Sequence, residues 1–258
     1  MTNKNTIIKN FSKNARHYDE HSKIQVECAG ELFGILPDKS FSNILEVGCG
    51  TGIFTKLLSR KYPEAAITAM DIAGNMLKFA EEKVNKRNVI FIEADGEKML
   101  FDKQFDLITS NASFQWFDDM NTAVSRMSNM LSPGGSMYFS IYGPATFCEL
   151  QSVLTEYFGE SHWLSSSKFM PQERLQRIVE DHFDVLEFQE KLYKAEFSSL
   201  LDLLRDIKFS GTSGEGLAGK AYLGKESLKD LERIYIEKFD GIIATHQVFF
   251  CGSKKEAR

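Results

Sequence analysis

The chain has 258 residues, of which 43% are hydrophobic and 26% charged, with only five prolines, and this composition excludes a disordered or fibrous chain. It supplies enough apolar side chains to fill a sizeable core. Thirty-one basic and 36 acidic residues give a net charge of −5, which argues against broad electrostatic binding to nucleic acid or to an anionic membrane.

Two helices are expected before the first strand. Ile8, Phe11, Ala15 and Tyr18 recur at helical spacing and predict an amphipathic helix within the first 20 residues. A second helix is expected over residues 22–36, because proline follows at position 37. A short apolar run over residues 43–47 then predicts a strand, which ends in a glycine turn and continues into a helix over residues 53–62.

Strands and helices continue to alternate along the chain. The expected strands cover residues 66–70, 89–93, 105–110 and 135–142, and the expected helices cover residues 73–86 and 121–131. This alternation predicts a mostly parallel sheet with helices on both faces. Later residues predict irregular helix over 144–183, strands over 185–194 and 241–251, and helices over 198–209 and 225–238. The glycine-rich stretch 211–219 is interpreted as a mobile lid or as an ordinary surface connection.

Three glycines follow the first strand directly, at positions 48, 50 and 52. Glycine lets the backbone turn tightly and approach a ligand without a Cβ in the way. A dinucleotide fingerprint that starts at Gly48 requires a small residue at position 53, where this chain has Ile53. The spacing therefore favours a smaller nucleoside, and a nicotinamide dehydrogenase is the more distant alternative.

Carboxylates end the next two strands of the predicted sheet. Asp71 closes the second strand, where a doubly wound sheet presents an acid to the two hydroxyls of a ribose. Asp95, followed by Gly96, ends the third strand at a position suited to the exocyclic amine of an adenine. Either acid alone is also a common strand end or helix cap, but together with the glycine turn they predict a nucleoside site.

These residues carry a resemblance to a known family. Glu46-Val-Gly-Cys-Gly-Thr-Gly52, Asp71 and Asp95 resemble the motifs of class I S-adenosylmethionine-dependent methyltransferases, over about residues 41–142 and the closing strand. The resemblance implies a Rossmann-like, doubly wound α/β sheet of seven mostly parallel strands, with N-terminal helices and a helical substrate cover. It implies S-adenosylmethionine as cofactor, S-adenosylhomocysteine as product and no metal. The cofactor-binding residues that it implies are Tyr18, Glu46, Gly48, Gly50, Gly52, Asp71, Ile72, Asp95, Gly96 and Asn111.

A narrower resemblance rests on three further segments. The segment Asp106-Leu-Ile-Thr-Ser-Asn-Ala-Ser-Phe-Gln-Trp116, with residues 11–18 and 204–212, is similar to the malonyl-acyl-carrier-protein O-methyltransferases of biotin synthesis. That family esterifies the free carboxylate of a malonyl thioester, which implies malonyl-carrier protein or malonyl-CoA as partner. The Ser-Asn-x-x-x-Gln-Trp part is shared with trans-aconitate methyltransferases. A methyltransferase for a free small carboxylic acid and a non-catalytic cofactor-binding module therefore stay as alternatives.

The expected chemistry needs no catalytic residue. A carboxylate with a pKa of about 4 is already the nucleophile at neutral pH, so positioning replaces a general base. Arg205 and Lys208 lie three apart on one predicted helix and are candidates to hold the substrate carboxylate, although solvated surface charges are the alternative. The complete set of expected substrate-binding residues is His17, Gln115, Trp116, Arg205 and Lys208.

Carrier proteins are acidic, so a carrier-linked substrate predicts a basic docking site. The first 18 residues contain four basic and no acidic residues. We expect the helix face formed by Lys9, Lys13 and Arg16 to meet the carrier.

The expected organisation has four parts. Residues 1–40 form helices that cover the active site, 41–143 the cofactor-binding core, 144–240 a helical cover with the sixth strand, and 241–258 the closing strand and tail. The four cysteines lie 21, 99 and 103 positions apart, which excludes zinc-finger spacing and disfavours a disulfide framework. With no apolar run typical of a membrane span or a secretory signal, we expect a cytoplasmic monomer that binds neither nucleic acid nor membrane.

Overall fold

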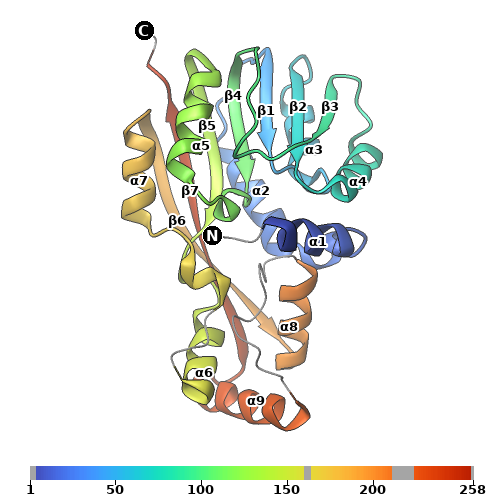
Figure 1. Cartoon of the computed structure of the whole chain (residues 1–258), viewed down its shortest axis with the longest axis vertical. Helices are drawn as coiled ribbons and strands as arrows, with labels where there is room; N and C mark the ends of the chain where they lie inside the picture. Colours follow the sequence, from blue (N-terminus) through green and yellow to red (C-terminus); the bar gives the residue numbers. More distant parts are fainter. Residues whose placement is uncertain (1–3, 160–163, 211–223, 257–258) are drawn as a thin grey trace.

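One seven-stranded sheet organises the computed structural model, which describes residues 4–159, 164–210 and 224–256 (Figure 1). The strand order is β3-β2-β1-β4-β5-β7-β6, and every neighbouring pair is parallel except the two that involve β7. This confirms the expected doubly wound, mostly parallel sheet. The strands are β1 Asn43–Val47, β2 Ala66–Asp71, β3 Val89–Glu93, β4 Phe105–Asn111, β5 Leu131–Tyr142, β6 Asp184–Phe197 and β7 Ile242–Lys254.

Helices cover both faces of the sheet because alternate strand residues point to opposite sides. Ile44 of β1 packs in one buried cluster with side chains of α2, α3 and α4, whereas its neighbour Leu45 packs in another with α5 and α7. These helices are α2 Lys23–Ile35, α3 Ile53–Lys61, α4 Gly74–Val84, α5 Met120–Met130 and α7 Gln172–Glu180. In this layered arrangement the strand order reverses between β1 and β4, which opens a crevice at the carboxyl ends of the strands.

The N-terminal residues do not form the single helix expected over the first 20 positions. Helix α1, Lys4–Asn14, ends where the buried Asn14 side chain donates a hydrogen bond of 2.9 Å to the backbone oxygen of Lys208. The chain then turns into the 3-10 helix η1, Tyr18–His21, before α2 begins. As a result α1 lies across the carboxyl edge of the sheet (Figure 1).

Strands β6 and β7 are longer than their hydrophobic patterns predicted. Strand β5 ends at Tyr142 opposite Val248, so residues 242–247 of β7 continue as a two-stranded ribbon with residues 192–197 of β6. The ribbon projects from the core, and α6 Cys148–Phe158, α8 Leu200–Phe209 and α9 Lys225–Phe239 pack around it in a buried cluster of their own (Figure 1). We call the ribbon and these helices the second lobe.

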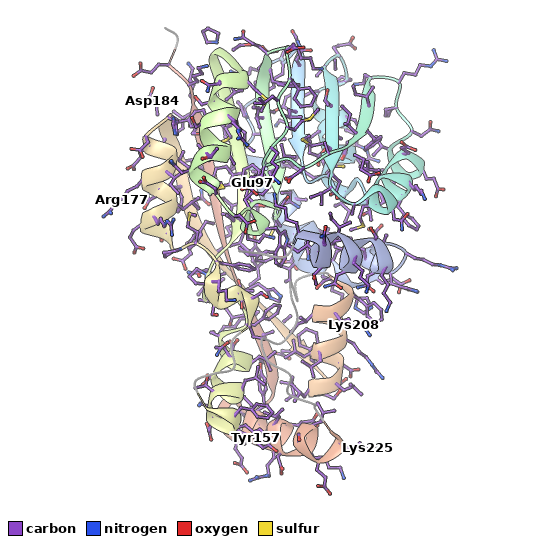
Figure 2. The ribbon with its side chains drawn as sticks, in the orientation of Figure 1. Glu97, Tyr157, Arg177, Asp184, Lys208 and Lys225 are labelled. Carbon is purple, nitrogen blue, oxygen red and sulfur yellow. The ribbon has the colours of Figure 1, made fainter. Side chains whose placement is uncertain are left out.

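The second lobe meets the N-terminal residues at one end. Lys208 lies at the end of α8 beside α1, whereas Tyr157 and Lys225 lie at the far end of the lobe (Figure 2). The glycine-rich stretch 211–219 lies outside the described residues. Within the described ranges, no helix combines the length and the apolarity that a bilayer crossing requires.

Replacing a buried leucine of the second lobe should destabilise the protein. Leu203 is 0% exposed in the cluster around the ribbon, so Leu203→Ala should lower the free energy of unfolding by about 2–5 kcal/mol. Leu201, two positions earlier and 45% exposed, is the matched control, and Leu201→Ala should change it by about 0.5 kcal/mol or less. Urea unfolding followed by circular dichroism measures both, and equal effects of the two substitutions would contradict the described packing.

Candidate active site

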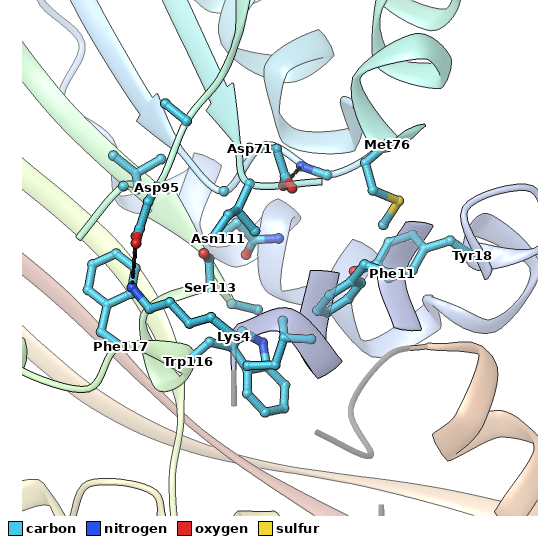
Figure 3. Close-up of a pocket in the computed structure, with 18 residues that line it drawn as sticks. Lys4, Phe11, Tyr18, Asp71, Met76, Asp95, Asn111, Ser113, Trp116 and Phe117 are labelled. Atoms are coloured by element: carbon cyan, nitrogen blue, oxygen red, sulfur yellow. Dashed lines mark hydrogen bonds and ion pairs between the residues drawn. The ribbon is translucent and has the colours of Figure 1, made fainter. Parts of the chain in front are cut away.

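A cavity lies between the carboxyl ends of β1, β2 and β4 and the N-terminal residues (Figure 3). Eight of the ten residues expected to bind the cofactor line it, namely Tyr18, Gly48, Gly50, Asp71, Ile72, Asp95, Gly96 and Asn111. The other two, Glu46 and Gly52, lie behind this lining. The structure thus brings residues from five separate parts of the chain to one place.

The glycine turn after β1 depends on three positive φ angles. Gly48, Gly50 and Gly52 have φ values of +73°, +55° and +81°, which disfavour any other residue. A Cβ on Gly48 would lie 2.0 Å from the Ser113 Oγ atom, so the turn passes in close contact with the segment after β4. A Cβ on Gly50 would meet nothing within 4 Å, and the turn therefore leaves open space on its cavity side.

Asp71 is held by the backbone and still has acceptor capacity. Its Oδ2 atom accepts from the Gly50 N–H at 2.9 Å, and its Oδ1 atom accepts from the Ala73 N–H at 2.8 Å. Burial raises the pKa of Asp71, while these backbone hydrogen bonds oppose the rise. The two oxygens of a carboxylate together accept about four hydrogen bonds, so the backbone N–H groups of Gly50, Ala73 and Ile72 leave acceptor capacity for a ribose hydroxyl.

Glu46 lies beneath the glycine turn and is 1% exposed. Its Oε2 atom has no hydrogen-bond partner among the described residues, and burial raises the pKa of Glu46 to about 8. An unpartnered buried carboxyl oxygen is costly unless a donor arrives. A cationic ligand group above the turn would offset that cost.

The structure pairs Asp95 with a residue that sequence reasoning did not assign to the site. Lys4 Nζ lies 2.8 Å from both carboxylate oxygens of Asp95 and 2.5 Å from Glu97 Oε2. Burial lowers the pKa of Lys4, but the hydrogen bonds to these two acids outweigh it and the pKa is raised. The only sequence signal for Lys4 was its place in a basic stretch.

Asp19 is a second residue that the sequence did not reveal. Thr51, inside the glycine turn, donates to Asp19 Oδ1 at 2.6 Å, and Lys83 Nζ lies 2.5 Å from Asp19 Oδ2. These contacts place the neighbouring Tyr18 on the cavity wall, where burial strongly raises the pKa of its hydroxyl.

The segment after β4 forms another wall. The Asn111 amide accepts from Ser140 Oγ at 2.7 Å and donates to the Gln25 backbone oxygen at 3.0 Å, which fixes its orientation. Trp116 lines the cavity and makes edge contacts with Phe11 and Phe169. Gln115 does not line the cavity: its Nε2 donates to the Ala112 oxygen at 2.7 Å, and its Oε1 is buried without a partner among the described residues.

Three expected substrate-binding residues lie away from the cavity lining. His17 is 51% exposed and pairs with Glu20 at 3.4 Å, and Arg205 is 58% exposed and pairs with Asp202 at 3.2 Å. The exposed Lys208 places its Nζ over the Phe209 ring. The expected docking residues Lys9, Lys13 and Arg16 are all exposed, and none forms an ion pair with another described residue. The expectation that they share one helix face is wrong for Arg16, because α1 ends at Asn14 and Arg16 lies in the turn that follows.

Known proteins resemble this chain in sequence and in fold. A family model described as "Methyltransferase domain" matches residues 45–139. The chain is 34% identical to "Malonyl-[acyl-carrier protein] O-methyltransferase 1" of Ilyobacter polytropus, over 93% of this chain and 89% of the relative. It is 36% identical to "Malonyl-[acyl-carrier protein] O-methyltransferase" of Priestia megaterium, over 83% of each.

A solved structure supports the fold. The N-methyltransferase NodS from Bradyrhizobium japonicum, in complex with S-adenosyl-L-homocysteine, is similar with a TM-score of 0.52. The similarity covers 89% of this chain and 86% of that one at 15% sequence identity. The overall fold is therefore shared with a methyltransferase of remote sequence.

Adding a methyl group to the first glycine of the turn should disrupt ligand binding. Gly48→Ala places a Cβ against Ser113 at a positive φ, so we expect the affinity for S-adenosylhomocysteine to fall by at least about tenfold. Isothermal titration calorimetry measures this change. Gly30→Ala is the matched control, because a Cβ on this exposed glycine of α2 meets nothing within 4 Å. Unchanged affinity in Gly48→Ala would show that the turn does not contact the ligand.

Proposed function

Because the chain belongs to the family of malonyl-[acyl-carrier protein] O-methyltransferases, we propose that it methylates the free carboxylate of a malonyl thioester carried by acyl carrier protein, with S-adenosylmethionine as donor. The observation that carries the proposal is the cavity that joins the glycine turn, Asp71 and Asp95 in a chain similar to these enzymes over 93% of its length. The product would be the malonyl methyl ester that starts the pimeloyl part of biotin.

The residues of the cavity fit the proposed cofactor. Asp71 has acceptor capacity left for the ribose hydroxyls beyond its backbone hydrogen bonds, and Asp95 offers a carboxylate to the adenine amine. The open space at Gly50 and the unpartnered Glu46 oxygen suit the methionine part with its ammonium group. When bound, S-adenosylmethionine supplies a methyl group on a positively charged sulfur.

The chain contributes position and shielding to this reaction. At neutral pH the acceptor carboxylate is ionised and needs no base, so alignment with the methyl group is the main requirement. Phe11 and Trp116 make apolar walls that keep water from the reacting atoms. Among the five expected substrate-binding residues only Trp116 lines the cavity, and we assign to it the wall on which the malonyl group packs.

The absence of Arg205 and Lys208 from the cavity lining is compatible with a carboxylate substrate. A buried carboxylate requires a nearby opposite charge, and the sulfonium of the cofactor supplies one. A neutral wall also leaves the carboxylate more nucleophilic than a tight ion pair with an arginine would. The expected roles of His17, Gln115, Arg205 and Lys208 remain predictions.

A labelled-methyl assay tests the function directly. S-adenosylmethionine with a labelled methyl group is mixed in parallel with malonyl-carrier protein, malonyl-CoA and trans-aconitate, and base-labile ester is counted. We expect label on both malonyl thioesters, with the carrier-bound form methylated fastest. Label on trans-aconitate alone would mean that the substrate is a free carboxylic acid, while the cofactor assignment would stand. No label anywhere, despite tight binding of S-adenosylhomocysteine, would point to another acceptor or to a non-catalytic module.

Reversing three charges on α1 and the turn after it should weaken recognition of the carrier. Lys9, Lys13 and Arg16 are exposed beside the helix face that lines the cavity, and an acidic carrier is attracted to them. The triple variant Lys9→Glu, Lys13→Glu, Arg16→Glu should raise the KM for malonyl-carrier protein by about tenfold at low salt, and by less at high salt. The KM for malonyl-CoA and the affinity for S-adenosylhomocysteine should not change.

A control variant separates docking from net charge. Lys194, Lys225 and Lys229 are also exposed, on β6 and α9, and their triple replacement by glutamate changes the net charge by the same amount. Steady-state kinetics of this control should match those of the wild type. Docking on Lys9, Lys13 and Arg16 would be refuted if the two triple variants had the same KM for the carrier substrate.

A further inference from the structure

The N-terminal segment, residues 4–22, is attached to the cavity near both of its ends. At one end Lys4 binds Asp95 and Glu97, and we call this contact the first clamp. At the other end Asp19 binds Thr51 and Lys83, and we call this contact the second clamp. Both clamps hold loops that carry proposed cofactor-binding residues.

The first clamp orients the Asp95 carboxylate. Lys4 Nζ donates to both oxygens, and the Glu97 N–H donates to Oδ1 at 3.1 Å. Oδ1 is thereby saturated, whereas Oδ2 keeps one acceptor position, with only the exposed Lys98 ammonium 3.8 Å away. Figure 3 shows the Lys4 side chain reaching from α1 along the cavity to this carboxylate. Without Lys4 the Asp95 side chain would lose the contact that fixes its rotation.

Glu97, the second acid of the first clamp, is itself fixed by backbone hydrogen bonds. This acid is 7% exposed, and its carboxylate accepts from the backbone N–H groups of Asp118 and Asp119 at 3.1 and 2.8 Å. The Lys4 ammonium, with a side chain only 19% exposed, supplies the positive charge that these two neighbouring acids require. An ion pair that is partly shielded from water is stronger than one on an open surface.

The second clamp joins the segment to the glycine turn. Lys83 Nζ also contacts Thr51 Oγ1 at 2.9 Å, so Asp19, Thr51 and Lys83 form a closed triangle. Thr51 is 1% exposed and lies between two glycines of the turn. Between the clamps, Ile7 and Phe11 face the cavity from the side opposite the sheet.

We propose that Lys4 is a positioning residue for the adenine end of the cofactor. It holds Asp95 so that the free acceptor position of Oδ2 receives the exocyclic amine, and together with the second clamp it closes the N-terminal segment over the bound nucleoside. The segment opens when both clamps release, and this opening sets the rate at which the cofactor leaves. The inference rests on the cofactor assignment of the proposed function, but not on the identity of the methyl acceptor.

Two ligands and a pair of matched variants test the inference. S-adenosylhomocysteine carries the adenine amine, whereas S-inosylhomocysteine carries a carbonyl oxygen in its place. Because the Asp95 carboxylate accepts a hydrogen bond and cannot donate one, it should favour the amine over this oxygen. Binding of each is titrated, and dissociation is followed by tryptophan fluorescence, since Trp116 lines the cavity. Lys4→Met removes the ammonium, and Lys9→Met removes an exposed one five positions later on the same helix. Neither experiment requires an acceptor substrate.

We expect Lys4→Met to weaken S-adenosylhomocysteine binding by about tenfold, to speed its dissociation, and to reduce the preference for the amine over the oxygen. Lys4→Arg should retain the preference, and Lys9→Met should match the wild type. The variant Asp19→Asn should speed dissociation of both ligands equally, because the second clamp does not touch the adenine. Adding Lys4→Met to Asp95→Asn should reduce the preference for the amine no further, since Lys4 acts on the adenine through Asp95.

Three outcomes would overturn the inference. Wild-type affinity, dissociation and preference in Lys4→Met would mean that the first clamp does not position Asp95. Tighter binding in Lys4→Met would mean that Lys4 competes with the adenine amine. A general loss of structure would lower the affinity for both ligands alike and leave the preference unchanged, which also counts against the positioning role. If the wild type bound neither nucleoside, the cofactor assignment itself would fail.

Discussion

The Asp71 carboxylate is the contact on which the rest of the site depends. By accepting hydrogen bonds from the Gly50 and Ala73 N–H groups, it fixes the end of β2 against the turn after β1, at the place where the strand order reverses. A turn with three positive φ angles has little intrinsic preference for one shape, so this anchor is needed to hold it. Once the turn is fixed, Thr51 faces Asp19, and the N-terminal segment acquires its attachment point.

The N-terminal segment in turn connects the core to the second lobe. The Asn14 side chain donates a hydrogen bond to the backbone oxygen of Lys208. The His21 Nδ1 atom lies 3.0 Å from Asp206 Oδ1, and the His21 ring stacks on Phe209. The segment therefore contacts both the cofactor cavity and α8. A movement of the segment would therefore also change its contacts with the end of the second lobe.

Charge is distributed in a way that suits transfer to an anion. The two acids that line the cavity are both held in place, Asp71 by backbone N–H groups and Asp95 by Lys4 and the Glu97 N–H. The wall near Trp116 is aromatic, so the acceptor carboxylate would find its strongest opposite charge on the cofactor.

The sequence by itself determined the layered sheet, the glycine turn and the acids at the strand ends. These features depend on local periodicity and on residues that follow one another within a strand, a turn and a helix. Only the tertiary structure decided the break at Asn14, the length of the β6–β7 ribbon and the partners of Lys4 and Asp19. Lys4 and Asp95 lie 91 positions apart, and a lysine in a basic helix resembles any solvated charge until packing places an acid opposite it. Long-range pairs of this kind arise from how the elements dock, which local patterns do not encode.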